Sequence, residues 1–486
     1  MANIEELMHE RLEKVRALRS RGVDPYPARA VFGVDVSRLI SEFDSYVKKD
    51  KPVTVRGRIM SIRKQGGLAF CDLVQGGARI QVLIKKDTVS DFAELMASVD
   101  GGDFIAAEGT LMTTKAGEKT VAATSVTILT KSLRPMPSEW YGLKDVEERY
   151  RRRYLDLVLN AETSQHIRLR AKLIQAIRTF LSGEEFLEIE TPILQTVAGG
   201  ATARPFETYS NALDIKLYLR VAPELFLKRL LVGGFDKVFE IAKNFRNEGI
   251  DREHNPEFTM LELYWAYQDY HGLMDFVERF IRDIATAAGV SDLSYNGVAF
   301  DLSGSWPRIP MADFVREHSG IDIAKDSEDA MRTYLTDNHV VFDPKSTRGE
   351  LADEIFKKAV RPKIVQPTFV IHHPKEISPL SKSRAENPQE TERFQLIIAG
   401  REVINGFSEL NDPVDQRERM EAQEALRGAG HAEVSRMDRD FIEALEYGMP
   451  PAAGLGMGID RLAAIFTNSN SIRDVIPFPT LKPRQE

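Results

Sequence analysis

The sequence predicts an α+β protein of more than one domain, in which a small β-barrel precedes a larger domain of helices and strands. The chain has 486 residues, more than a single ordinary hydrophobic core accommodates. Between residues 51 and 135, short runs of alternating apolar residues are separated by glycines, as in small barrels. From residue 161 to residue 486, helical periodicity alternates with strand-like runs, which is typical of a mixed domain.

Composition and charge narrow the class of protein. The chain is 43% hydrophobic and 28% charged, as in soluble globular proteins, and no run reaches the roughly 20 apolar residues that cross a membrane. The N-terminal stretch lacks the apolar core of a secretory signal. The single cysteine, Cys71, excludes internal disulfides and cysteine-based metal sites and fits a cytoplasmic location. A net charge of -8 argues against indiscriminate nucleic-acid binding but leaves room for a local basic surface.

The first 135 residues predict a nucleic-acid-binding barrel. Residues 1 to 50 contain an amphipathic helix whose basic face is either solvated or in contact with RNA. The strands from 51 to 135 fit an OB-fold. Strand alternation turns Phe70 and Gln81 outward, where a ring stacks on a base and an amide reads its edge. The alternative is that the next domain covers Phe70. Residues 136 to 160 are a proline-punctuated linker followed by a basic helix.

The run FRNEGIDREHNPEFTMLELYWAY, residues 245 to 267, predicts two strands around a charged loop. Alternation places Arg246 and Glu248 on one face of the first strand, and Phe258, Glu262 and Tyr264 on one face of the second. One surface would then carry a cation, carboxylates, a stackable ring and a phenol. An exposed hairpin with salt bridges is the alternative.

Two further motifs suggest phosphate and metal binding. In GLGMGIDRLAAIF, residues 454 to 466, alternating glycines leave one face of a strand bare, and Arg461 could hold a phosphate. In GREVINGFSELND, Asn405-Gly406 predicts a two-residue turn that sets Glu402 opposite Glu409. Opposed like charges favour a shared Mg²⁺, and a solvated acidic hairpin is the alternative. Because the chain has no P-loop, these motifs fit adenylation of a carboxylate by a nucleoside triphosphate.

These residues resemble the motifs of class II aminoacyl-tRNA synthetases, and nearly end to end the chain resembles the bacterial-type lysyl-tRNA synthetases. FLEIETPIL (186 to 194) is similar to motif 1, residues 238 to 267 to motif 2, and residues 454 to 466 to motif 3. The resemblance implies an antiparallel sheet flanked by helices, a helical insertion at about 320 to 366, and a homodimer with Pro192 in its interface. It also implies activation of L-lysine with ATP and transfer to the 3′ end of tRNA(Lys), with more than one Mg²⁺ per active site.

The resemblance also implies residue roles, with Arg246 and Arg461 as catalytic groups. ATP would contact Arg246, Glu248, His254, Asn255, Phe258, Glu402 and Arg461. Lysine would contact Gly200, Glu224, Arg246, Glu262, Tyr264 and Asn411. Glu402 and Glu409 would bind Mg²⁺, and Phe70 and Gln81 would bind the anticodon.

The choice of lysine depends on the acidic and hydrogen-bonding groups Glu262, Tyr264 and Asn411, which suit an ammonium group. An aspartyl or asparaginyl synthetase is the nearest alternative, although an aspartate pocket would present an Arg or Lys. The paralogue that lysylates elongation factor P lacks the OB-fold. A non-catalytic tRNA-binding paralogue would have no use for the two Arg residues and the acidic pair.

Overall fold

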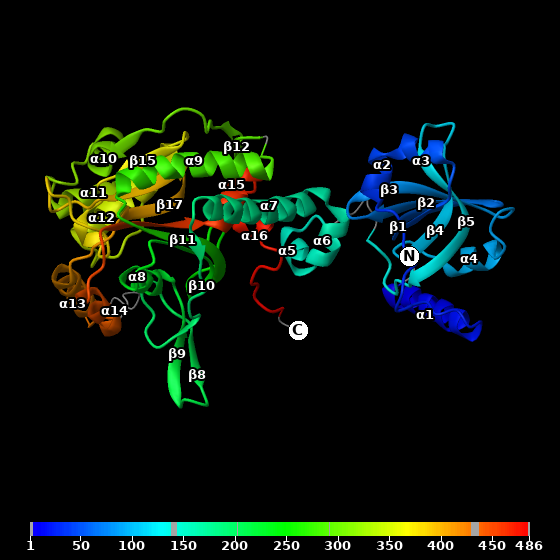
Figure 1. Ribbon diagram of the computed structural model, residues 1–486, viewed down its shortest axis with the longest axis horizontal. Helices are drawn as coiled ribbons and strands as arrows, with labels where there is room; N and C mark the ends of the chain where they lie inside the picture. The colour runs from blue at the N-terminus through cyan, green and yellow to red at the C-terminus, as the bar shows by residue number, and fades with distance from the viewer. Residues whose placement is uncertain (1–2, 138–142, 202, 291, 429–436, 485–486) are drawn as a thin grey trace. The chain divides into compact units, whose positions relative to one another are not determined.

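The computed structural model describes residues 3–137, 143–201, 203–290, 292–428 and 437–484 (Figure 1). The chain divides into two compact units, Met1–Ser164 and Gln165–Glu486, and each is described by itself. Part of the predicted linker, residues 138–142, lies outside the described residues. Among the described residues, no helix is both long and apolar enough to cross a membrane.

The first unit is built on a closed five-stranded barrel with strand order β1-β2-β3-β5-β4. The barrel strands are β1 (Val53–Gln65), β2 (Leu68–Gln75), β3 (Ala78–Lys85), β4 (Phe104–Thr113) and β5 (Lys119–Thr130). The helices of the unit are α1 (Ile4–Ser20), α2 (Val36–Ser41), α3 (Phe43–Lys49), α4 (Phe92–Ser98), α5 (Val146–Arg151) and α6 (Arg153–Leu159). Ala69, Cys71 and Leu73 are fully buried inside the barrel. The predicted barrel is therefore confirmed.

Two expectations for this unit need correction or refinement. Gln81 is buried rather than outward-facing, because β3 pairs with β5 and the Thr120 hydroxyl donates to Gln81 Oε1 at 3.1 Å.

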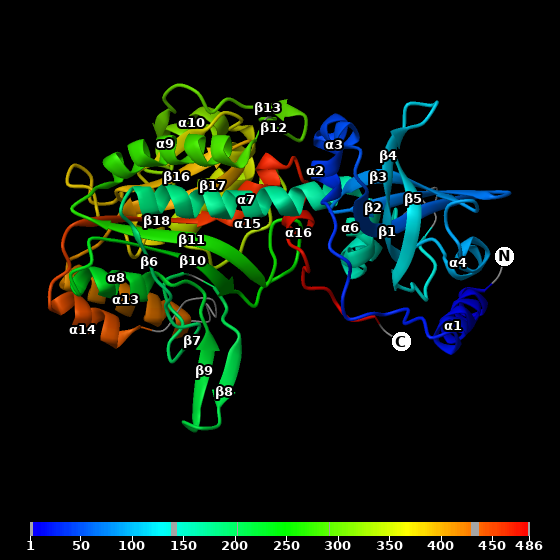
Figure 2. The same ribbon diagram turned by 45° about the vertical axis from the view of Figure 1, so that its right-hand side comes forward.

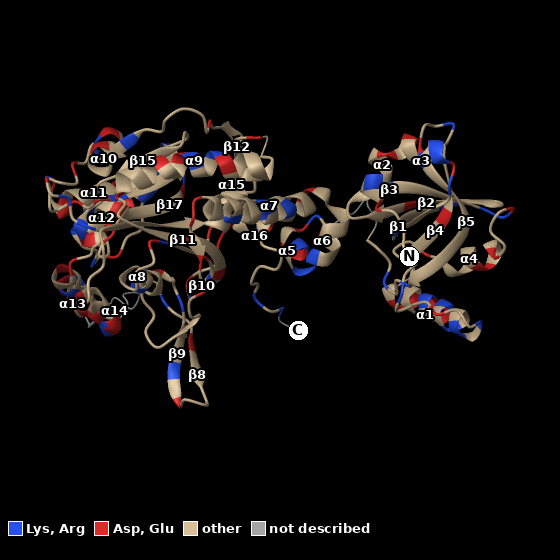
Figure 3. Cartoon of the chain, in the orientation of Figure 1, with Lys and Arg blue, Asp and Glu red and all other residues tan. Residues whose placement is uncertain are grey.

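On α1, which carries charges of both signs (Figure 3), Arg11 donates to the Ser132 carbonyl at 2.8 Å. Lys14 pairs with Asp100 at 2.7 Å. These two basic residues of α1 thus bind the barrel.

The second unit is organised around an eight-stranded sheet with the order β14-β15-β16-β17-β18-β11-β10-β6. The sheet strands are β6 (Leu187–Glu188), β10 (Lys237–Phe245), β11 (Glu257–Ala266), β14 (Arg308–Pro310), β15 (Thr368–Ile371), β16 (Arg393–Ile398), β17 (Arg401–Ser408) and β18 (Ala452–Gly458). Only the β6–β10 and β14–β15 pairs, one at each edge of the sheet, are parallel. The mainly antiparallel sheet matches the expected α+β class.

Helices cover both faces of this sheet. One apolar cluster joins α7 (Ala161–Gly183), α9 (Tyr270–Ala288) and α15 (Ile459–Phe466) to sheet residues such as Phe239 and Leu263. A second joins α8 (Glu224–Val232), α13 (Pro413–Gly428) and α14 (Arg439–Glu446) to the alternate residues Val238 and Tyr264. The short helix α16 (Ile472–Val475) follows α15.

Residues 320–366, for which a helical insertion was predicted, contain mainly helical elements. It contains α11 (Glu328–Asp337), α12 (Arg348–Ile355), a π-helical turn (Phe356–Val360) and a 3₁₀ turn (Arg361–Lys363). These elements pack with α10 (Met311–Ser319) around a hydrophobic cluster that also includes Val370 of β15 and Ile397 of β16. A 3₁₀ turn at Lys375–Ile377 and the short pair β12 (Ser294–Tyr295) and β13 (Val298–Ala299) complete the list of connecting elements.

A three-stranded arm follows the motif 1 segment. It contains β7 (Leu194–Gln195), β8 (Glu207–Ser210) and β9 (Ile215–Leu219) in the order β7-β9-β8. Figures 1 and 2 show β8 and β9 extending away from the large sheet. Several apolar side chains of this region are exposed, namely Leu187, Ile193, Leu194, Tyr209, Leu213 and Ile215.

The prediction of a two-residue turn at Asn405-Gly406 is wrong. β17 runs straight through both residues and pairs with β16 on one side and β18 on the other. The turn lies at Ala399 and Gly400, whose φ angles of 49° and 74° are both positive, as two-residue hairpin turns require. Gly406 is a glycine for packing reasons, because a Cβ there would lie 2.6 Å from the Phe394 ring.

Candidate active site

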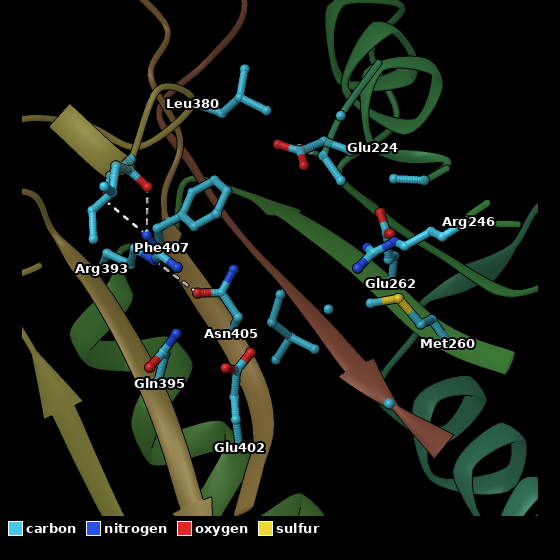
Figure 4. Close-up of a pocket in the computed structure, with 18 of the residues that line it drawn as sticks. Glu224, Arg246, Met260, Glu262, Leu380, Arg393, Gln395, Glu402, Asn405 and Phe407 are labelled. Atoms are coloured by element: carbon cyan, nitrogen blue, oxygen red, sulfur yellow. Dashed lines mark hydrogen bonds between the residues drawn. The ribbon is translucent and has the colours of Figure 1, made fainter. Parts of the chain in front are cut away.

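A cavity of about 700 Å³ lies over β11, β16, β17 and β18 of the large sheet. Figure 4 shows Met260 and Glu262 of β11 on one side, and Asn405 and Glu402 of β17 on the other. Between them runs β18, because the strand order is β17-β18-β11. The wall is completed by α8, the loop after β10 and the α12 segment.

The glycines of β18 make this hollow possible. Gly454 pairs with Tyr264, Gly456 with Glu262 and Gly458 with Met260. A Cβ at Gly454 would clash with Glu409 Oε1 and lie 2.5 Å from Tyr264 Cδ1. The three glycines thus lie on one face of β18, and the space beside them is used by side chains of β11 and by Glu409, which follows β17.

Most of the predicted ATP and lysine contacts come together here. The predicted residues that line the cavity are Gly200, Glu224, Arg246, Glu248, His254, Asn255, Phe258, Glu262, Tyr264, Glu402 and Arg461. Along β11, the side chains of Phe258 and Tyr264 are six residues apart, which corresponds to about 20 Å in an extended strand. The cavity is thus long enough for two ligands end to end.

Arg246 lines the cavity beside Phe258. It follows β10 directly, and its N–H donates to the Pro256 carbonyl at 2.9 Å, which closes the base of the loop. Its guanidinium lies 5.1 Å from the centre of the Phe258 ring, and its buried Nε has no hydrogen-bond partner in the described part of the chain. Burial lowers the pKa of Arg246, while Glu248 and Glu262 oppose this. An arginine remains charged under such conditions, so this group is available to an anion.

Arg461 lies in the first turn of α15 near the same end. Its guanidinium donates to the Glu402 carbonyl at 2.6 Å. The preceding residue, Asp460, accepts from Arg170 at 2.8 Å and from the Thr259 N–H at 2.7 Å. These bonds tie α7, β11 and α15 together, so the start of α15 is held firmly against the cavity.

The other end of the cavity is acidic. Burial raises the pKa of Glu262 to about 8, assisted by Glu224, and the Tyr264 hydroxyl donates to Glu262 Oε2 at 3.1 Å. Burial also raises the pKa of Glu409, against the opposing effect of Lys228. The pKa of Glu262 stays raised although Arg246 opposes the shift, so a cationic ligand beside this carboxyl group would favour its ionised form.

The residues near Glu402 fit a hard cation. Gln395 Oε1 is buried and has no hydrogen-bond partner among the described residues, and it lines the cavity with Glu402. A carboxylate and an amide oxygen are suitable Mg²⁺ ligands when phosphates and water supply the others. Within the described ranges, no group of three or more His, Cys, Asp and Glu side chains gathers as a metal site.

Glu409 does not face Glu402 across a hairpin, since the turn on which that expectation depended lies elsewhere. Instead, Glu409 forms an ion pair with Lys228 and lies against Gly454 and thus near Tyr264. Glu402, by contrast, is 3.7 Å from Arg361. The two carboxylates therefore have different partners.

The remaining predicted residues lie elsewhere. Asn411 is not part of the cavity lining, and its amide accepts from Lys382 at 2.8 Å and donates to the Met449 carbonyl at 3.3 Å. Pro192 follows β6, near the exposed arm. Phe70 is half-buried on β2 in the first unit, where Gln81 also lies.

Sequence reasoning missed several lining residues. On β16, Arg393 donates to Asn405 Oδ1 at 2.8 Å and to the Ile377 carbonyl at 2.8 Å. Arg393 and Gln395 alternate with apolar residues, a pattern that could have placed them on one strand face. Lys357 and Arg361 line the cavity from the π-helical and 3₁₀ turns, and no sequence signal predicts a π-helix.

Comparisons with known proteins agree with this arrangement. A family model described as "tRNA synthetases class II (D, K and N)" matches residues 145–482, and a model for an OB-fold nucleic acid binding domain matches residues 53–129. A lysine–tRNA ligase of Pelotomaculum thermopropionicum is 49% identical over 99% of this chain and 96% of its own length. The lysine–tRNA ligases of Moorella thermoacetica and Carboxydothermus hydrogenoformans are each 47% identical, over 99% of both chains. The chain therefore belongs to the class II tRNA synthetases of the D, K and N group, within the lysine–tRNA ligase family.

Proposed function

We propose that this protein activates L-lysine with ATP and transfers the lysyl group to the 3′ end of tRNA(Lys). The observation that carries the proposal is that one cavity is lined both by the arginines Arg246 and Arg461 and by the buried acids Glu224 and Glu262. Relatives named lysine–tRNA ligases, which match over nearly the whole chain, support the same reaction. The reaction belongs in the cytoplasm, where tRNA and ATP are used for translation.

The first step joins lysine to AMP. A carboxylate oxygen of lysine attacks the α-phosphorus of ATP, and the bond to the bridging oxygen breaks so that pyrophosphate leaves. Repulsion between the two anions is the main obstacle, and Arg246, with its unpartnered Nε, would hold both in line. Phe258 would stack on the adenine, and Arg461 would bind the outer phosphates, with Glu248, His254 and Asn255 nearby.

Bound Mg²⁺ would neutralise phosphate charge, and Glu402 with the Gln395 oxygen would hold it at the cavity wall. In the second step the terminal ribose hydroxyl of tRNA attacks the carbonyl carbon of the adenylate and AMP leaves. The OB-fold, matched by a nucleic acid binding family, would bind the anticodon, with Phe70 as a stacking platform.

Lysine selection would depend on the acidic end. Glu262 and Tyr264 are hydrogen-bonded to each other and line the cavity, and Glu409 lies beside Tyr264. An ammonium group would meet carboxylates there, whereas the side chain of aspartate would meet like charge. We therefore assign Glu262 and Tyr264 to the lysine side chain, Glu224 to the α-amino group, and Gly200 to the space beside Glu224.

We propose further that the protein is a homodimer. The exposed apolar residues from Leu187 to Ile215, on either side of Pro192, supply a surface that a second copy would cover. This surface begins in the segment that resembles motif 1 and continues into the three-stranded arm.

Amino-acid-dependent exchange of labelled pyrophosphate into ATP tests the reaction. We expect exchange with lysine and none with aspartate or asparagine. Exchange with either of those amino acids and not with lysine would move the protein to a sister specificity, and no exchange with any amino acid would favour a purely tRNA-binding role.

A further inference from the structure

Residues 377 to 381, which we call the wall segment, line the cavity without a role in the reaction outlined above. Leu380 of this segment (Figure 4) packs against the apolar cluster that contains Leu225 and Tyr264. The Ser381 hydroxyl is buried and has no hydrogen-bond partner in the described part of the chain. The wall segment thus brings an apolar side chain and an unpaired hydroxyl to the part of the cavity that we assign to lysine.

Arg419 of α13 holds the wall segment by its backbone. Its Nη1 donates to the Ser378 carbonyl at 3.1 Å and to the Ser381 carbonyl at 2.8 Å. Its Nη2 donates to the hydroxyl of Ser383, just beyond the segment, at 2.8 Å. Buried carbonyls need donors of this kind, and here one guanidinium group satisfies two of them.

Two further bonds restrict the same stretch of backbone. Gln416, also on α13, donates from Nε2 to the Pro379 carbonyl at 3.1 Å. The N–H of Leu410 donates to the Leu380 carbonyl at 3.0 Å. With the two bonds from Arg419, four consecutive carbonyls of the wall segment accept hydrogen bonds from outside it. The position of the segment is therefore set by its surroundings rather than by its own secondary structure.

Asp415 fixes the orientation of Arg419. Arg419 Nε donates to Asp415 Oδ1 at 2.9 Å and Nη2 donates to Oδ2 at 2.6 Å, a two-point contact that holds the guanidinium plane. Hydrogen bonds from Arg419 lower the pKa of Asp415, so this carboxyl group is ionised at neutral pH. Arg419 is buried and is not part of the cavity lining. It therefore acts on the wall segment and not on a ligand.

Resting on the proposed function, we propose that Arg419 is a positioning residue for lysine, which sets the shape of the lysine site through the wall segment. Without the guanidinium group, two buried carbonyls would lose their donor, which is costly, and the segment would shift to find others. Leu380 would then move away from the site of the lysine side chain. A pocket without a fixed wall distinguishes poorly between side chains that differ by one methylene group.

The test compares the full-length protein with its Arg419→Met, Arg419→Lys and Leu380→Ala variants. Exchange of labelled pyrophosphate into ATP at varied lysine and ATP gives both KM values, and ornithine, one methylene shorter than lysine, is measured as an inhibitor. In Arg419→Met we expect the KM for lysine to rise about tenfold, the effect of a misfit of one methylene group. The KM for ATP should change much less, and ornithine should lose less affinity than lysine.

The other two variants separate the hydrogen bonds from the contact. Arg419→Lys keeps a charged donor, so it should recover part of the lost lysine affinity. Leu380→Ala keeps every backbone bond and removes the side chain that Arg419 positions, so it should raise the KM for lysine in the same way. Adding Arg419→Met to Leu380→Ala should then have less effect than Arg419→Met alone.

Arg417→Met is the matched control. Arg417 lies on the same helix, outside the cavity lining, and forms an ion pair with Glu446 of α14. Its removal should leave the KM for lysine unchanged. Equal rises in the KM for lysine and for ATP in Arg419→Met would overturn the proposal, as would an unchanged KM for lysine in either Arg419→Met or Leu380→Ala. Failure of the wild-type protein to exchange pyrophosphate with lysine would instead overturn the proposed function.

Discussion

Gly454 is the residue on which the acidic end of the cavity depends most directly. It lies between Tyr264 on β11 and Phe407 on β17, and the carboxylate of Glu409 occupies the space beside it. Any side chain at this position would compete with the groups that we assign to lysine. The constraint is steric and therefore independent of charge.

Gly454→Ala should raise the KM for lysine by about tenfold or more, because its Cβ displaces Glu409 and Tyr264 and overpacking of this kind costs about 1–3 kcal/mol. The KM for ATP should change less. Pyrophosphate exchange at varied lysine and ATP measures both constants. Gly183→Ala is the control, since a Cβ there has no neighbouring atom within 4 Å. A lysine KM unchanged in Gly454→Ala would contradict the assignment of this end of the cavity.

Glu262 makes lysine binding depend on pH. Its burial, with help from Glu224, raises the pKa of Glu262 to about 8, so at pH 7 the empty site holds a proton on this carboxyl group. The substrate ammonium keeps its charge to about pH 10 and favours the ionised carboxylate. Lysine affinity should therefore rise from about pH 6 to about pH 8, with release of a proton on binding.

Calorimetry in buffers of different ionisation enthalpy measures that proton release directly. The Glu262→Gln variant should bind lysine more weakly and with a flatter pH profile. Proton uptake on lysine binding would contradict this role of Glu262. So would equal pH profiles of lysine affinity for the wild-type protein and the Glu262→Gln variant.

At the scale of secondary structure, strand alternation predicted most of what the site contains. Phe258, Glu262 and Tyr264 line one cavity because side chains on a strand repeat with a period of two. Arg246 was expected on the preceding strand, but β10 ends at Phe245 and Arg246 reaches the cavity from the loop that follows. The turn at Asn405-Gly406 could not be placed in this way. The local signal was strong, but pairing of β17 with strands on both sides outweighed it, and such pairing between distant segments is invisible in a local pattern.

The error on Gln81 has a similar origin. Alternation places its side chain opposite Ile80 and Val82, but whether that face is open depends on the neighbouring strand. In the barrel, Thr120 of β5 lies beside Gln81 and contacts its amide. Alternation predicts which residues share a face, and the tertiary fold decides which face is exposed.

The arm that follows motif 1 leads to a prediction about assembly. Replacing Leu194 by Asp should weaken the proposed dimer, because a charge would be buried among apolar side chains. Sedimentation equilibrium should show a shift toward monomer. Val341→Asp is the control, since Val341 is 92% exposed and lies in the insertion. If the Leu194→Asp variant dimerises with the same dissociation constant as the wild-type protein, the dimer interface lies on another surface.

At the scale of the whole molecule, the two units separate two tasks. The first contains the barrel matched by a nucleic acid binding family, and the second contains the cavity. Activation of lysine should therefore proceed without the barrel surface, whereas charging of tRNA should require it.

Phe70→Ala tests this separation. Loss of base stacking costs about 1–3 kcal/mol, so the KM for tRNA should rise about tenfold or more while lysine-dependent pyrophosphate exchange stays the same. Phe32, whose ring is 94% exposed in the lead-in to the barrel, provides a matched Phe→Ala control. If Phe70→Ala leaves tRNA charging unchanged, its ring does not take part in anticodon binding.

The cluster of Lys228, Glu224 and Glu409 also limits which substitutions these three positions can accept during evolution. Because the ammonium of Lys228 pairs with both of these buried acids, the loss of Lys228 alone would leave them without their counter-charge inside the protein, which is severely destabilising. A lineage could replace Lys228 only by changing at least one of the two acids with it. Among descendants of this gene, we expect the three positions to be retained as a set or to vary in concert.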